Sequence, residues 1–237
     1  MLPIFMVLQL AIYLLFHVFE RLYPSHNHQR PPFFGLYWVL LGFFAIFWLR
    51  VTFLLWIEFP AIGMKIFSEW WIEGGGFYLV YSFSNYWFHR FKHSNSIAWK
   101  YLHTFHHSPS HMEARIAFYR HPVEVVANSV LLVFLGKILL DVSVVAVAFA
   151  LLIEGGLEVF HHSNIRLDRR FRWVGYIIQT PEMHLVHHQK GVHRYNYGPF
   201  LWDAVFGTAR FPDDEVQALG FCRSRDILGF LVFKHKE

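Results

Sequence analysis

Long hydrophobic runs separated by short polar stretches dominate the pattern along the chain. Met1–Phe19 is almost wholly apolar, and a stretch with three prolines, Tyr23–Pro32, follows it. The first run lacks a basic leader and a small-residue cleavage site, so we expect a retained membrane helix rather than a signal peptide. Phe33–Ile57 is a second run. As a helix it would be about 37 Å long and would cross a ~30 Å hydrocarbon core with some tilt.

The later hydrophobic runs are shorter and more interrupted. Phe77–His93 is more polar, and we expect a helix that starts at or in the membrane and carries its histidines out of it. Val123–Leu140 and Val142–Phe160 are two apolar runs that meet at Gly136–Asp141. Their lengths predict a hairpin that enters the bilayer and returns. From His161 onward the chain is polar.

The composition agrees with a membrane protein. The chain is 55% hydrophobic, 20% aromatic and only 16% charged, whereas soluble domains average about 25% charged residues. We therefore predict an all-α fold, an integral membrane bundle of about four transmembrane helices. We divide it into an N-terminal hairpin with an interfacial segment (1–74), a histidine-rich domain that contains the second hairpin (75–210) and a tail (211–237). The basic pI of about 9.2 comes with no nucleic-acid motif, and attraction to an anionic leaflet explains it better.

The distribution of basic residues predicts an orientation. If two spans precede the first histidines and a hairpin separates these from the last ones, all the histidines face the same side. Of 21 lysines and arginines, only Arg21, Arg30 and Lys137 then fall in connections on the opposite side. The positive-inside bias places the histidines in the cytoplasm. The membrane would be the endoplasmic reticulum or a bacterial inner membrane.

Eight histidines form three short clusters with repeated spacings. They are His89 and His93; His103, His106 and His107; and His184, His187 and His188. Residues four apart share one face of a helix. In both triplets the middle histidine is three residues after the first, which widens that face enough to serve two neighbouring ions. Neutral imidazoles can crowd together without mutual repulsion, and metal ions make such crowding favourable.

The residue types leave the metal open, because imidazole suits zinc, copper, iron and nickel alike. Eight or more ligands indicate two ions, since a structural zinc needs four. The Glu-x-x-His spacing of soluble di-iron bundles occurs once, at Glu158–His161. The alternatives to an oxidative enzyme are a membrane zinc-dependent hydrolase, in which bound water attacks an ester or amide, and a metal carrier without catalytic activity.

Together the motifs resemble the fatty acid hydroxylase/sterol desaturase superfamily, whose members are membrane-bound histidine-box di-iron oxygenases. The resemblance covers roughly residues 75–210 and rests on six motifs in the family's order. They are HRFKH (His89–His93), LHTFHHSP (Leu102–Pro109), RHPVE (Arg120–Glu124), HSN (His162–Asn164), TPEMHLVHH (Thr180–His188) and NYGPFLWDAVFGT (Asn196–Thr208).

The resemblance implies a cytosolic, histidine-lined di-iron cap on the helical bundle. Its enzymes use O₂ and two electrons to hydroxylate or desaturate a C–H bond of a lipid such as a sterol or fatty acid. Carried over by position, nine histidines are expected iron ligands: His89, His93, His103, His106, His107, His162, His184, His187 and His188.

Several neighbouring residues are expected in other roles. Whether His161, His121 or His111 also contacts metal stays open, and Asn196 and Asp203 are candidates to hydrogen-bond the far nitrogen of a ligand histidine. No fused haem or flavin motif is visible, so a separate cytochrome b5, ferredoxin or reductase would supply the electrons. The basic segment Arg166–Arg172 is its expected docking site.

Overall fold

The computed structural model describes residues 1–26, 68–192, 194–212, 218–221, 229 and 231–234. Its regular elements are helices, and the described residues form no strand beyond three isolated bridges. This confirms the predicted helical membrane fold. Three described helices are long and apolar enough to cross a membrane. The predicted span Phe33–Ile57 lies outside the described residues.

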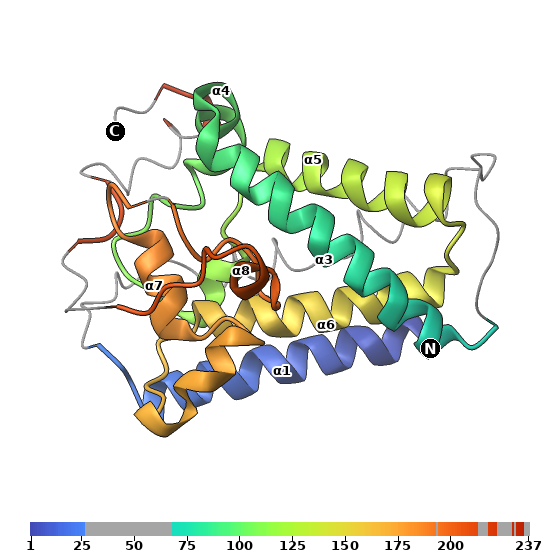
Figure 1. The fold of residues 1–237 in the computed structure, drawn as a ribbon, viewed down its shortest axis with the longest axis horizontal. Helices are drawn as coiled ribbons and strands as arrows, with labels where there is room; N and C mark the ends of the chain where they lie inside the picture. The colour runs from blue at the N-terminus through green and yellow to red at the C-terminus, as the bar shows by residue number, and fades with distance from the viewer. Residues whose placement is uncertain (27–67, 193, 213–217, 222–228, 230, 235–237) are drawn as a thin grey trace.

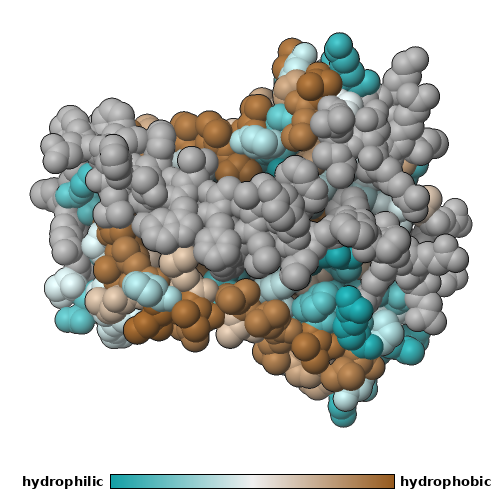
Figure 2. Space-filling model, turned by 180° about the vertical axis from the view of Figure 1, so that it is seen from behind, coloured by the Kyte–Doolittle hydropathy of each residue, from teal (hydrophilic) through white to brown (hydrophobic). Residues whose placement is uncertain are grey.

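Hydrophobic sequence explains the three candidate spans. The first run forms α1 (Leu2–Leu22). The predicted hairpin is α5 (Pro122–Val133), continued by a π-helical turn η3 (Phe134–Leu139), followed by α6 (Val144–His162). Much of α1 points away from the protein, with Ile4, Val7 and other apolar side chains exposed. Figure 2 shows hydrophobic surface along the body of the molecule, as expected of helices that face lipid.

The helix predicted as Phe77–His93 starts earlier than expected. It is α3 (Trp70–Ser94), and it runs beside α6 along the molecule (Figure 1). The consecutive glycines, which would ordinarily break a helix, lie inside α3. Gly74 is needed there because α3 approaches α6 closely at this position. A Cβ atom on Gly74 would stand 2.7 Å from the carbonyl oxygen of Ala146. The polar start of α3 is satisfied as well, since Glu73 accepts a hydrogen bond from Ser143, the N-cap of α6.

The extra length of α3 corrects the predicted topology. We expected the connection after the first span to lie opposite the histidines. Instead, the end of α1 lies at the histidine end. Ser25 donates its backbone N–H to the carbonyl of Asn164 (2.9 Å), and Arg166 donates to that of Tyr23 (3.1 Å). The reason is that α3 runs the full length of the bundle. The prediction counted only two helices that connect the two ends before the first histidines, and α3 is a further one. Arg21 therefore belongs to the histidine end, and Lys137 stays at the other.

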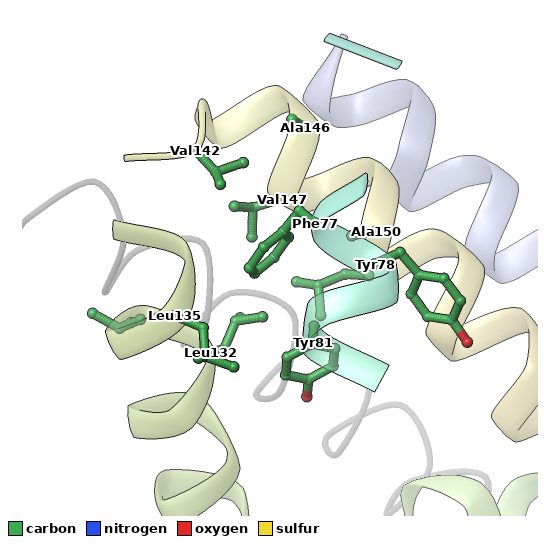
Figure 3. Close-up of a cluster of buried hydrophobic side chains, with 11 residues drawn as sticks. Phe77, Tyr78, Tyr81, Leu132, Leu135, Val142, Ala146, Val147 and Ala150 are labelled. Atoms are coloured by element: carbon green, nitrogen blue, oxygen red, sulfur yellow. The ribbon is translucent and has the colours of Figure 1, made fainter. Parts of the chain in front are cut away.

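The core between α3, α5 and α6 is apolar and tightly packed (Figure 3). Phe77 and Tyr81 of α3 share this core with Leu132 of α5 and Val147 of α6, and all four are at most 2% exposed. Their burial fixes the position of α3, whose far end carries His89 and His93. The core therefore positions the first histidines relative to α6.

Two adjacent glycines of α3 test this packing. Gly74→Ala would force the Cβ against the backbone of α6, and we expect a loss of about 1–3 kcal/mol of stability. Gly75→Ala is the matched control, because nothing lies within 4 Å of its Cβ position, and alanine favours a helix. Thermal unfolding in detergent would measure both. Equal effects of the two substitutions would contradict the close approach.

Candidate metal centre

Four segments bring histidines to one end of the bundle. The end of α3 carries His89 and His93, and the end of α6 carries His162. After α3, Asn95 caps a short helix α4 (Ser96–Ala98) by accepting hydrogen bonds from two backbone N–H groups. A π-helical turn η1 (Trp99–His103) and the following turn hold the first triplet. The helix α7 (Pro181–His188) holds the second.

The nine histidines separate into two compact groups. In each group, one ring nitrogen per residue lies within 4.8 Å of all the others. The first His group consists of His89, His93, His103, His107 and His187. The second His group consists of His106, His162, His184 and His188.

The closest nitrogens are at distances typical of ligands around one ion. In the first His group, Nε2 of His89 lies 2.7 Å from Nε2 of His103 and 3.2 Å from that of His93. In the second, Nε2 of His184 lies 2.9 Å from that of His162 and 3.1 Å from that of His188. Two nitrogens bound at right angles to a common ion, each about 2.1 Å away, lie about 3.0 Å apart.

Hydrogen bonds on the outer side show which nitrogen carries the proton in the first His group. Nδ1 of His89 donates to the carbonyl of Tyr197 (2.5 Å), and Nδ1 of His103 donates to the carboxylate of Glu124 (2.8 Å). In a neutral imidazole the Nε2 atoms are then bare acceptors. Two bare nitrogens 2.7 Å apart repel each other unless a cation lies between them.

The same arrangement occurs in the second His group. Nδ1 of His106 donates to the carbonyl of Tyr119 (3.1 Å), and Nδ1 of His162 donates to that of Glu158 (2.8 Å). Their Nε2 atoms face each other at 3.1 Å. The facing Nε2 atoms therefore suit a bound cation in each group. This conclusion follows from the chemistry of the imidazole rings.

Burial keeps these imidazoles neutral. The pKa values of His103, His106, His107 and His184 all lie well below the usual 6.5, because burial disfavours the charged form and neighbouring histidines add repulsion. A neutral ring is the form that offers a lone pair to a metal. At neutral pH these four rings therefore present nitrogen ligands, not positive charges.

A model of the family described as fatty acid hydroxylase matches residues 75–208. This is more than half of the chain, and it includes all nine histidines of the two groups. The chain belongs to the fatty acid hydroxylase family. No curated protein and no solved structure gave a match.

Each triplet of this fatty acid hydroxylase family member contributes to both groups. His103 and His107 belong to the first and His106 to the second, while His187 belongs to the first and His184 and His188 to the second. The expected helical face holds only for α7. In the first triplet, η1 ends at His103 and the next two histidines lie in the turn after it. The wider π-helical turn and the tight turn together replace the predicted helix.

His121, His111 and His161, whose roles the sequence left open, lie outside both groups. His121 caps α5, where its Nδ1 accepts from the N–H of Val123. His111 pairs with buried Glu113 at 2.6 Å. His161 is 2% exposed, and its Nε2 lies 3.6 Å from Glu158. It could form a smaller group with Glu158 and His162.

A buried ion pair supports the first His group, and sequence reasoning missed it. Glu124 is fully buried and accepts from Lys92 Nζ at 2.8 Å with the same oxygen that binds His103. Because a carboxylate holds the far nitrogen, the His103 ring has a fixed orientation and greater basicity. In the sequence, Lys92 and Glu124 each lie beside an apolar run, where a charged side chain is ordinarily exposed to solvent. The position of Glu124 within the RHPVE motif was the one feature that could have indicated its role.

Asn196 and Asp203 were expected to hydrogen-bond the histidine rings, but both bind backbone groups instead. Asn196 Nδ2 donates to the carbonyls of Met183 and Arg210, both at 2.7 Å. Asp203 accepts from the N–H groups of Tyr197 (2.8 Å) and Gly198 (2.7 Å). They brace the loop whose carbonyls bind histidines, including the Tyr195 carbonyl that accepts from His187 Nδ1. Their contribution to the histidine orientation is therefore indirect.

A small cavity lies between the two groups. Histidines of both line it, together with polar and charged side chains. Its lining residues are Asn85, His89, Lys92, His103, His106, Arg120, Glu158, His161, His162, His184 and Tyr197. Arg120 pairs with Glu158 at 2.5 Å, and Lys92 pairs with Glu124 at 2.8 Å, so both cations of the lining are balanced by carboxylates.

Asp203 gives a pH-dependent prediction. Burial raises its pKa from 3.8 to about 6. Because the folded value exceeds the unfolded one, this group's contribution to stability is complete below about pH 4 and is lost as the pH rises through 6. Position 203 does not titrate in Asp203→Asn. The difference in the free energy of unfolding, wild type minus variant, should therefore decrease as the pH rises from about 4 to 6 and stay constant above pH 6. Thermal unfolding across this range measures it, and a constant difference would contradict the burial of this carboxyl.

Proposed function

We propose that the protein is a membrane-bound di-iron oxidoreductase that uses O₂ to hydroxylate or desaturate a C–H bond of a lipid. The observation that carries this proposal is the pairing of bare Nε2 atoms in both His groups, within the region that matches the family. Such pairs call for two cations. The family association supports the choice of a lipid oxidation over other reactions of two metal ions.

The side chains have distinct roles in this proposal. The first His group would hold one iron and the second His group the other. Bound irons would supply the oxygen activation that no amino-acid side chain provides. Glu124 and the carbonyls of Tyr119, Tyr195 and Tyr197 hold the far ring nitrogens, so the ligands are oriented before a metal binds.

The lipid substrate would react at the cavity between the groups. Histidines from both groups line this cavity, so a C–H bond placed there is next to both metal positions. Lys92 and Arg120 are paired with Glu124 and Glu158, so the charge around the cavity is nearly balanced. The three candidate spans support entry of the substrate from the bilayer.

Electrons would come from a separate cytochrome b5, ferredoxin or reductase. We further propose that the histidine end faces the cytoplasm, in the endoplasmic reticulum or a bacterial inner membrane. Arg21, Arg90 and Lys92 lie at this end, whereas Lys137 lies at the opposite end and pairs with Asp141. This asymmetry among the described residues supports the cytoplasmic orientation.

Metal analysis and lipid mass spectrometry test the proposal. Purified protein should contain about two irons per chain, and cells that express it should accumulate a lipid with one oxygen gained or two hydrogens lost. Product formation should stop without O₂. A membrane zinc hydrolase is the competing function. Zinc in fully active protein, with turnover under anaerobic conditions, would establish it and refute the proposal.

A further inference from the structure

The connection between α6 and α7 combines exposed basic and aromatic side chains. It contains η4 (Arg169–Tyr176), a 3-10 helix capped by Asp168, which accepts a hydrogen bond from the N–H of Arg170 at 3.0 Å. Residues 166–177 contain four arginines and a single aspartate. Phe171, Trp173 and Tyr176 are 43%, 61% and 56% exposed. Exposed large aromatic rings beside arginines are unusual for a surface that faces only water.

The position of η4 relates it to the membrane boundary. The connection starts with a bridge between Ile165 and Pro24, directly after α1. Both α1 and α6 are candidate spans, and both end here. In Figure 1 the orange segment that includes η4 lies beside the end of α1. The segment is therefore at the level where two helices leave the hydrocarbon. Tyr23 at the same level is 61% exposed.

The inner face of η4 is packed against the element that carries the second triplet. Gly175 is buried, and a Cβ there would stand 2.6 Å from the sulfur of Met183 in α7 and equally close to the ring of Phe211. Arg172 lies over the Phe211 ring at 4.7 Å. Gly175 of η4 therefore packs directly against Met183 of α7.

We propose that η4 binds the surface of a bilayer containing anionic lipids, on the side of the two His groups. Tryptophan and tyrosine prefer the headgroup level of a bilayer, and arginines there attract anionic headgroups. The basic charge alone fits an acidic electron donor as well. The exposed rings and the position at the ends of two spans favour lipid. This inference does not depend on the proposed reaction.

A fluorescent label at position 173 tests the proposal in full-length protein. Trp173→Cys would be labelled with bimane in a Cys222→Ser background and reconstituted into vesicles of phosphatidylcholine with phosphatidylglycerol. Lys190→Cys, exposed beyond the end of α7, is the matched control. We expect a phospholipid that carries a nitroxide on its headgroup to quench the label at 173 several-fold more than that at 190. Soluble iodide should show the opposite preference. Phe171→Cys provides a second position.

Two further comparisons distinguish lipid from an acidic electron carrier as the partner of η4. Pure phosphatidylcholine vesicles, or Arg170→Glu, should reduce lipid quenching at 173, whereas Lys190→Glu with the same charge change should not. Quenching by iodide alone at both 173 and 171 would overturn the proposal. So would a label that becomes shielded only when a reduced, acidic electron carrier is added, which would identify a protein-docking surface.

Discussion

Replacing His184 with alanine should remove one metal ion and abolish lipid oxidation. Nε2 of His184 contacts the Nε2 atoms of both His162 and His188, so it is central to the four-member second His group. The remaining three ligands would leave that ion weakly held, whereas the first His group keeps all five of its members. We expect bound iron to fall from about two to about one per chain and turnover to drop by more than about 100-fold.

Metal analysis and product formation by mass spectrometry would measure both effects. His121→Asn is the control, because His121 is buried but caps α5, and asparagine is a good N-cap. This variant should keep both ions. Full metal content and full turnover in His184→Ala would show that the second His group does not hold a metal that the reaction needs.

Replacing Glu124 with alanine should destabilise the protein and weaken metal binding together. Lys92 would keep a buried charge without a partner, which costs about 3–5 kcal/mol. His103 would lose the acceptor of its Nδ1 proton, and loss of such a partner reduces metal affinity by about 10–100-fold. Thermal unfolding of the metal-free protein and metal titration report the two effects separately.

The double variant Lys92→Met/Glu124→Gln distinguishes positioning from stability. It leaves no unpaired charge, so the thermal stability should recover. Its metal affinity should stay lower than that of the wild type, because a neutral amide oxygen polarises His103 less than a carboxylate does. If the affinity recovered together with the stability, the role of Glu124 would be purely structural.

Hydropathy and spacing predicted those parts of the molecule that depend on local sequence. The first helix and the hairpin of α5 and α6 follow from apolar runs, and the structure confirms them. The topology was wrong because α3 contains polar residues and consecutive glycines. Only the packed position of Gly74 against α6 reveals that they continue the helix.

The histidine spacing selected the residues that the structure places in two groups, but not the shape of the segments that carry them. The first triplet lies in a π-helical turn and the turn after it, a geometry that results from packing. Asn196 and Asp203 were expected at the rings and instead brace a loop. Glu124 was missed because a carboxylate at the start of an apolar run is ordinarily solvated. Whether the grouped histidines bind iron stays a prediction.

The first helix is more than an anchor. Near its end, Glu20 is fully buried, and its carboxylate accepts hydrogen bonds from the backbone N–H groups of Ala114 (2.8 Å) and Asn164 (3.2 Å). These two residues follow the first triplet and His162. A shortened protein that starts after this helix would leave these two amides without their carboxylate acceptor, in the loops adjoining both histidine groups. Supplying another membrane anchor in its place would therefore return the protein to the bilayer without restoring the framework of the site.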